Sequence, residues 1–172
     1  ITSLDINLLK SQLGYFLVDS KMKSFFEFST ERVVWVEVNE DRKTLSYAEN
    51  LILNLNELGM RKNHLLIVVG GGFLQDIGTL IASIYMRGVK WIFVPTTLAA
   101  MGDSCIGGKS SINVGEAKNI VGNFYPPNSV HIDVNFTKTL PEVEVLAGLS
   151  EILKICFAHS AKTFEKSLAL LD

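Results

Sequence analysis

One stretch of the sequence, residues 65–76, constrains the fold more than any other. Five apolar residues lead into three consecutive glycines, and the apolar spacing then becomes helical over residues 73–86. A strand that passes through glycines into a helix leaves backbone N–H groups that no Cβ shields, which suits a pyrophosphate. The dinucleotide fingerprint G-x-G-x-x-G is half present, because Gly70 and Gly72 fit but Gln75 stands where the last glycine belongs. Taken alone, the stretch fits a nucleotide site about as well as a tight turn without a ligand.

Composition narrows the class of protein. A chain of 172 residues that is 48% hydrophobic has enough apolar material for one domain, or for one domain and part of another. No apolar run is long enough to span a membrane, and a net charge of −2 without a basic run gives no reason to expect nucleic acid. Cys105 and Cys156 stand far apart in unlike contexts, which favours free thiols in a reducing cytoplasm. The chain opens at Ile1 and stops within a helical pattern, so we expect a fragment of a longer protein.

Strand and helix patterns alternate along the chain, which predicts an α/β fold: a Rossmann-like, doubly wound, mostly parallel sheet. Strands are expected at residues 15–18, 33–38, 65–69, 91–94 and 130–133, with a frayed edge strand within 1–7. Helices are expected at residues 21–28, 45–58, 73–86, 141–159 and from 161 onward. Asp19, the glycine turn, Thr96 and Thr97 all follow strand ends, so they should line one crevice.

A long polar, glycine-rich segment covers residues 99–128, with a hairpin expected near 110–114. A loop of this length inside a compact domain is usually functional. The P-loop pattern fails, because Asp103 stands where its first glycine belongs and no strand leads directly in. Lys109, Lys118 and Asn119 remain as donors suited to a phosphate, and a solvated polar hairpin is the alternative.

Glu151 and Lys154 lie three positions apart on the helix that Pro141 opens, so they share one face. From spacing alone, a surface ion pair worth less than about 1 kcal/mol is the simpler interpretation. His64, His131 and His159 form no metal-binding spacing with one another.

Taken in order, these motifs resemble the 3-dehydroquinate synthase family of sugar-phosphate cyclases, over about residues 15–171. The matching residues are Gly70, Gly71, Gly72 and Asp76; Tyr85, Met86, Arg87 and Gly88; Pro95, Thr96, Thr97 and Leu98; Asp103, Gly107, Gly108 and Lys109; Asn113, Lys118, Asn119 and Tyr125; Lys138, Thr139, Leu140 and Pro141; and Ala147, Gly148, Leu149, Ser150, Glu151, Ile152, Leu153 and Lys154. The resemblance implies two domains, an NAD-binding α/β domain over residues 1–140 and the start of a helical, metal-binding domain over 141–172. It also implies that two histidine zinc ligands of the family lie beyond Asp172.

The resemblance also implies roles for individual residues. The positions similar to those that hold the cofactor are Asp19, Glu40 and Lys43 on the adenosine side, Gly71, Gly72, Thr96 and Thr97 near the pyrophosphate, and Asp76 and Lys118 on the nicotinamide side. The positions similar to those that hold the substrate are Arg87, Lys109 and Asn119 for its phosphate and Asp103 and Lys154 for its ring hydroxyls. Glu151 resembles a zinc ligand, with cobalt as the alternative metal.

The activity implied is a carbon–oxygen lyase of the shikimate pathway, which cyclises a seven-carbon sugar phosphate while NAD is transiently reduced. Partners implied are the sugar phosphate and a second copy in a homodimer. Three alternatives stay open: a cyclase for another sugar phosphate, a non-catalytic NAD-binding module, and a metal-dependent alcohol dehydrogenase of related fold. Lys109, Asn119 and Lys154 count against the last two, because neither needs a cradle for phosphate and hydroxyls. The chain departs from the commoner residues of the family at Gln75, Cys105 and Ser110–Ser111.

Overall fold

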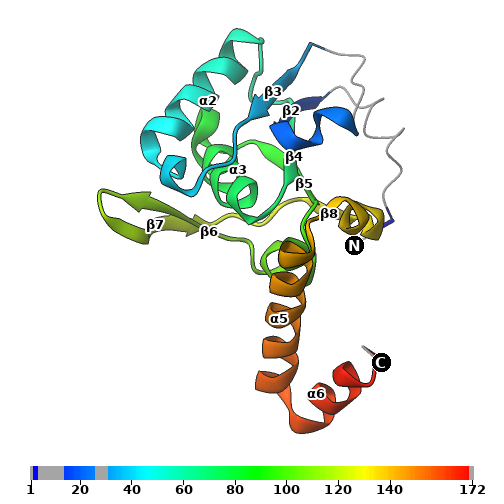
Figure 1. Ribbon diagram of the computed structural model, residues 1–172. Helices are drawn as coiled ribbons and strands as arrows, with labels where there is room; N and C mark the ends of the chain where they lie inside the picture. The colour runs from blue at the N-terminus through cyan, green and yellow to red at the C-terminus, as the bar shows by residue number, and fades with distance from the viewer. Residues whose placement is uncertain (1, 4–13, 26–30, 171–172) are drawn as a thin grey trace.

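The computed structural model describes residues 2–3, 14–25 and 31–170 of the chain. A six-stranded parallel sheet forms its centre, in the order β1-β8-β5-β4-β2-β3, and a two-stranded antiparallel hairpin, β6-β7, stands beside it (Figure 1). The strands are β1 Thr2–Ser3, β2 Gly14–Asp19, β3 Val33–Val36, β4 Leu65–Gly70, β5 Lys90–Pro95, β6 Lys109–Val114, β7 Ala117–Phe124 and β8 Ser129–Ile132. The longer helices are α2 Leu45–Glu57, α3 Gly72–Ile84, α5 Glu142–His159 and α6 Ala161–Leu168. Short helical turns are η1 Ser20–Ser24, η2 Glu40–Arg42, η3 Tyr85–Arg87, η4 Ala100–Ser104, α4 Cys105–Gly107 and η5 Val134–Thr139.

The central strands are buried on both faces, which explains their nearly continuous apolar sequences. Alternate residues of β2, β4 and β5 enter two separate cores. Leu17, Val68 and Phe93 belong to the core beneath α2 and α3, whereas Val18 and Val69 belong to the core beneath η1 and η5. The α/β, Rossmann-like prediction is therefore confirmed.

The segment from residue 99 to residue 128 is more regular than the sequence predicted. A π-helix, η4, leads through α4 into the hairpin, which was expected near residues 110–114 and extends from Lys109 to Phe124. Nearly every residue of β7 is exposed, so this strand carries no apolar alternation for a sequence pattern to detect. The predicted helix over 21–28 is a 3₁₀ turn over Ser20–Ser24, and residues 26–28 lie outside the described part. Of the strand expected within 1–7, the described part contains Thr2–Ser3.

Helix α5 leaves the α/β body after Pro141 and projects from it, with α6 folded back at its far end (Figure 1). Its first half packs on the segment after β5, where Gly148 lies against Leu98 and Ala99, and Ile152 lies against Gly102. A Cβ on Gly148 would come within 2.7 Å of the backbone nitrogen of Ala99, so this close approach requires glycine.

Candidate active site

The carboxyl ends of β2, β4 and β5 lie side by side, as predicted. They bring Asp19, the glycine turn, Thr96 and Thr97 to one edge of the sheet. A cavity of about 290 Å³ lies there, lined by Asp19, Thr96 and Thr97 and also by Thr139 and Leu140 of the segment that leads into α5. Ligands of open α/β sheets bind outside the carboxyl ends of the strands, so this edge is the candidate cofactor site.

The glycine turn fits a pyrophosphate. Gly71 is the N-cap of α3 and supplies no side-chain cap, so the first amides of the helix have no such partner. A Cβ added to Gly72 would meet no atom within 4 Å, which leaves open space above the turn. A Cβ on Gly71 would lie 2.8 Å from Cγ2 of Thr97, so the turn and the end of β5 already touch. An anion can therefore approach the helix N-terminus with no side chain in the way.

Asp19 is almost buried at the end of β2 and caps the following turn. Its Oδ1 accepts a hydrogen bond of 2.9 Å from the backbone N–H of Lys21. This bond fixes the carboxylate at the rim of the cavity.

Lys43 is the centre of a polar network beside the glycine turn. Its side chain is 7% exposed, and its ammonium donates to Asp76 Oδ2 at 3.2 Å and to Asn119 Oδ1 at 2.8 Å, with Glu40 Oε1 at 3.1 Å. Three elements thus meet at one cation: the turn after β3, helix α3 and the hairpin β6-β7. The resemblance assigned Glu40 and Lys43 to the adenosine side, Asp76 to the nicotinamide side and Asn119 to the substrate phosphate. In the structure, the side chains of the other three residues all contact Lys43.

Asn113 joins this network to the hairpin, a role that sequence reasoning missed. It is buried, its backbone N–H donates to the Lys43 carbonyl at 2.7 Å, and its Nδ2 donates to the Glu40 carbonyl and to Glu40 Oε1, each at 3.1 Å. Its Oδ1 accepts from the backbone N–H of Asn119 at 3.0 Å. Asn113 stood in a matching motif, but nothing in its spacing indicated the contact with Glu40, which lies 73 positions away.

The pKa values of the two acids in the network, Asp76 and Glu40, are shifted in opposite directions. Burial raises the pKa of Asp76 above its ordinary value, although the Ser111 N–H and the Lys43 ammonium oppose the rise. Burial alone would also raise the pKa of Glu40, but hydrogen bonds from Asn113 and Lys43 and the charges of Lys43 and Lys118 bring it below its ordinary value. Exposed Lys118 therefore lies within electrostatic reach of this network.

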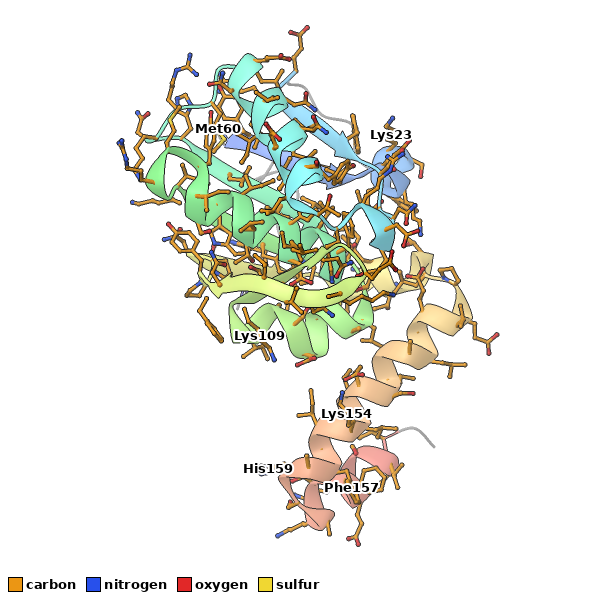
Figure 2. The ribbon with its side chains drawn as sticks, turned by 90° about the vertical axis from the view of Figure 1, so that its left-hand side faces the viewer. Lys23, Met60, Lys109, Lys154, Phe157 and His159 are labelled. Carbon is orange, nitrogen blue, oxygen red and sulfur yellow. The ribbon has the colours of Figure 1, made fainter. Side chains whose placement is uncertain are left out.

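A second group of predicted residues lies where α5 packs on η4. Lys154 is paired with Glu151, and that contact together with the charges of Glu151 and Asp103 raises the pKa of the Lys154 ammonium. Asp103, Glu151 and Lys154 are thus brought near one another by the contact of Ile152 with Gly102. Figure 2 shows Lys154 on the projecting helix, below the α/β body. Among the described residues, no three histidine, cysteine, aspartate or glutamate side chains are placed to hold a metal ion together.

Gln75, one of the departures from the family pattern, connects α3 with η4. Its side chain is buried and its Nε2 donates to the Ser104 carbonyl. Gln75 Oε1, Thr79 Oγ1 and Ser104 Oγ are buried and have no hydrogen-bond partner among the described residues. The glutamine at this position therefore ties α3 to the turn that carries Asp103.

Arg87 and Lys109 are not brought to the Lys43 network. Arg87 follows the C-terminal end of α3, whereas Asp76 lies near its N-terminal end, and the 11 positions between them correspond to about 16 Å of helix. Lys109 pairs with Phe124, five positions along β7 from Asn119, which corresponds to about 17 Å. Of the three predicted phosphate ligands, Arg87 and Lys109 therefore lie apart from Asn119, and Figure 2 shows Lys109 at the side of the α/β body.

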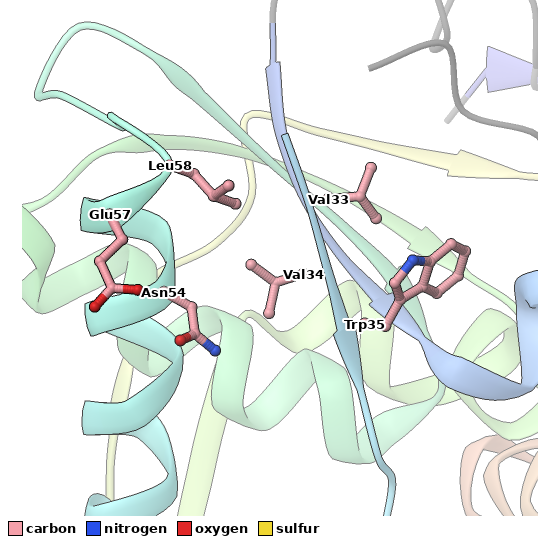
Figure 3. A pocket seen from close by; sticks show the side chains of 6 residues that line it. All are labelled: Val33, Val34, Trp35, Asn54, Glu57 and Leu58. Carbon is pink, nitrogen blue, oxygen red and sulfur yellow. The ribbon is translucent and has the colours of Figure 1, made fainter. Parts of the chain in front are cut away.

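Three further hollows lie away from the candidate site in the described part of the chain, and one of them, of about 590 Å³, lies along α2, where Leu45, Ile52 and Ile84 are among its lining residues. Another of about 330 Å³ lies between β3 and the end of α2 and is lined by Val33, Val34, Trp35, Asn54, Glu57 and Leu58 (Figure 3). A wider one of about 620 Å³ is lined by Lys62, Ile84, Met86 and Arg87 at the C-terminal end of α3. The cavity of about 290 Å³ differs from these hollows because residues at the carboxyl ends of the strands, Asp19, Thr96 and Thr97, line it. No helix of the described residues has the length and apolar character needed to cross a bilayer.

A comparison of the sequence with protein-family models and a comparison with known proteins lead to the same family. Residues 33–147 match the family model described as 3-dehydroquinate synthase N-terminal. The 3-dehydroquinate synthase of Dictyoglomus thermophilum is 40% identical over 132 residues, which are 77% of this chain and 37% of that protein. The enzyme of the same name from Endomicrobium trichonymphae is 39% identical over 160 residues, 93% of this chain and 43% of that protein. The chain thus spans about two fifths of the length of these relatives.

Several solved structures of other proteins have a fold similar to that of this chain. A 2-epi-5-epi-valiolone synthase from Streptomyces hygroscopicus with NAD⁺ and Zn²⁺ bound superposes with a TM-score of 0.79 at 26% identity, over 90% of this chain and 48% of that one. A 2-deoxy-scyllo-inosose synthase complexed with carbaglucose-6-phosphate, NAD⁺ and Co²⁺ gives a TM-score of 0.75 at 27% identity, over 86% and 46%. An iron-containing alcohol dehydrogenase from Corynebacterium glutamicum shares the fold, with a TM-score of 0.68 at 18% identity over 87% of this chain and 43% of that one.

Proposed function

The chain belongs to the 3-dehydroquinate synthase family, and we propose that it is the NAD-binding part of a 3-dehydroquinate synthase-like cyclase. The proposed reaction converts a seven-carbon sugar phosphate into a carbocycle and eliminates phosphate, which makes the enzyme a carbon–oxygen lyase. In the proposed division, residues 1–140 bind the cofactor and residues 141–172 begin a helical domain for metal and substrate. The two free cysteines agree with a cytoplasmic location.

The observation that carries the proposal is the polar network around Lys43, because it stands beside an open glycine turn at the carboxyl edge of the sheet. A binding site for NAD needs a turn that admits a pyrophosphate and polar groups that hold the two riboses. We assign the turn to Gly71 and Gly72 with Thr96 and Thr97 nearby. The ribose and ring positions are assigned to the acids and lysines of the crevice: Asp19, Glu40, Lys43, Asp76 and Lys118.

When bound, NAD would supply a reversible hydride acceptor, so that an oxidised substrate hydroxyl makes the neighbouring C–H acidic and phosphate can leave. The residues of this chain would position the substrate for these reaction steps. Asp103 and Lys154 would hold ring hydroxyls, and the Lys154 ammonium would stabilise negative charge on the hydroxyl oxygen. Asn119, Lys109 and Arg87 would hold the phosphate.

Glu151 is the proposed ligand for zinc or cobalt. One carboxylate is too few, because catalytic zinc normally takes three protein ligands. In the proposal, the other ligands come from a helical domain such as the additional length of the relatives contains. Zinc would there act as a Lewis acid on the hydroxyl being oxidised.

A homodimer is part of the proposal. Its support is the position of Arg87 at the far end of α3 from Asn119, since one chain does not bring both to one phosphate. A second copy would allow Arg87 to complete the site of its partner.

A cyclase for another sugar phosphate is the alternative. It is supported by the structural similarity to 2-deoxy-scyllo-inosose synthase, whose complex contains carbaglucose-6-phosphate. Phosphate release from a seven-carbon sugar phosphate and from a hexose 6-phosphate, measured with a protein that includes the helical domain, would separate the two.

Calorimetry with NAD⁺ tests the part of the proposal that this chain carries. Gly71→Val should abolish NAD⁺ binding, because the added side chain would collide with Thr97 and displace the turn that is proposed to admit the pyrophosphate. Gly115→Ala, at the tip of the hairpin, is the control for the loss of a glycine. Absence of NAD⁺ binding by the unmodified protein would refute the proposal.

A further inference from the structure

We propose that Ser111 is a positioning residue for Asn119. Together with Lys43 it holds the amide oxygen of Asn119, so that the NH₂ group of the amide is presented to an oxygen of the substrate phosphate. The inference rests on the proposed function, in which Asn119 binds that phosphate. Ser111 is one of the positions at which the chain departs from the commoner residues of the family, so the resemblance assigned it no role.

The orientation of the Asn119 amide follows from its partners. A lysine ammonium has donors and no acceptor, so the atom that faces Lys43 Nζ at 2.8 Å must be the oxygen. The Ser111 hydroxyl donates to the same oxygen at 3.0 Å. An amide oxygen has two lone pairs, and these two bonds occupy both.

The backbone of Asn119 is fixed as well. Its φ is 57°, a left-handed conformation that asparagine adopts more readily than most residues, and its N–H donates to Asn113 Oδ1 at 3.0 Å. Asn113 is itself buried and bonded to the Lys43 carbonyl. The exposed Nδ2 is the polar group of this residue that has no hydrogen-bond partner within the described part of the chain. Its N–H donors are thus available to an anion, which can only accept.

Ser111 reaches the network from two sides. Its backbone N–H donates to Asp76 Oδ1 at 2.9 Å, and its hydroxyl donates to Asn119. Removal of the hydroxyl therefore leaves the backbone contact to helix α3 in place. Ser110 offers a matched control, because its hydroxyl donates to Asn123 Oδ1 at 2.9 Å, elsewhere on the same hairpin.

Inorganic phosphate is the probe. It is titrated into the protein saturated with NAD⁺, so that the pyrophosphate position is filled, and binding is followed by the NMR signals of the side-chain amides. We expect Ser111→Ala to weaken phosphate binding about threefold to tenfold, the range of one hydrogen bond. Ser111→Thr should restore it, Ser110→Ala should match the unmodified protein, and the NAD⁺ affinity of all three variants should be unchanged.

A double-mutant cycle distinguishes positioning from a general effect on the hairpin. In an Asn119→Ala background, Ser111→Ala should cause no further loss, because the group that it positions is gone. A loss in Ser110→Ala equal to that in Ser111→Ala would overturn the inference. So would unchanged phosphate affinity in Ser111→Ala alongside a loss in Asn119→Ala, although the proposed function would then stand. Unchanged phosphate affinity in Asn119→Ala would overturn the inference and also count against the proposed role of Asn119.

Discussion

The ammonium of Lys43 lies 3.2 Å from a carboxylate oxygen of Asp76, although the two residues are 33 positions apart. This contact ties the turn after β3 to helix α3. Because Lys43 also bonds to Asn119, 76 positions away, one buried cation joins three segments that the sequence treats separately. The Lys43 ammonium therefore both holds residues of the candidate site in place and contributes to the stability of the fold.

Lys43→Met should destabilise the protein by about 1–3 kcal/mol, since it leaves a largely buried carboxylate without its counter-ion. Urea unfolding measures the change in the free energy of unfolding. Arg42→Met is the control, because its partner Glu37 and Arg42 itself are 71% and 49% exposed, and such a pair contributes less than about 1 kcal/mol. Equal losses in the two variants would show that the network adds nothing to stability.

Asp76 and Glu40 should titrate on opposite sides of their ordinary pKa values, Asp76 above 3.8 and Glu40 below 4.5. The stability linked to Asp76 is fully present below 3.8 and is lost as pH rises through its raised pKa. The stability linked to Glu40 has the opposite sign, being present above 4.5 and lost as pH falls through its lowered pKa. NMR titration of the carboxyl carbons measures both. An Asp76 carboxyl that titrates below 3.8 would contradict the effect of burial described here.

Much of the fold was predictable because its signals are local. The strand of residues 65–70, its glycines and the helix that follows each have a pattern within a dozen residues, and strand ends converge by the geometry of parallel sheets. The exposed strand β7 and the π-helix have no such pattern. The contacts of Asn113 and Asn119 with the turn after β3 depend on how the hairpin packs, which no spacing in the sequence encodes. The sequence could name most members of the site but not which of them touch.

Thr79→Val should be neutral or stabilising, whereas Gln75→Ala should cost about 1–3 kcal/mol. The Thr79 hydroxyl is fully buried and has no partner in the described part of the chain, so an apolar isostere removes an unsatisfied group. Gln75 instead donates to Ser104, and its removal leaves that carbonyl unpaired and a cavity behind. Thermal unfolding ranks the variants, and hydrogen exchange over residues 100–105 should increase in Gln75→Ala alone. A strong loss in Thr79→Val would indicate that an internal water satisfies the hydroxyl.

NAD⁺ should bind in preference to NADP⁺. Asp19 and Glu40 stand at or just beyond strand ends in the proposed ribose region, where a carboxylate accepts from a 2′-hydroxyl and repels a 2′-phosphate. Calorimetry with both cofactors measures the preference, and Asp19→Asn should reduce it by weakening the repulsion. Asp133→Asn is a suitable control, because that aspartate also caps a 3₁₀ turn but does not line the cavity. Tighter binding of NADP⁺ would show that these acids do not face the ribose.

Zinc should be retained through Glu151 only when further ligands are present. The described residues contain no group of three metal-binding side chains, and a single carboxylate holds zinc weakly. The 172-residue chain should therefore lose zinc on dialysis, whereas a protein that includes the helical domain should keep it in stoichiometric amount. In that protein, Glu151→Ala should remove the metal and turnover together, and Glu165→Ala, on exposed α6, should change neither. Elemental analysis after dialysis measures the metal. Full zinc content in the Glu151→Ala variant would return Glu151 to the simpler interpretation, a surface partner of Lys154, because nothing else in the described structure assigns it to a metal.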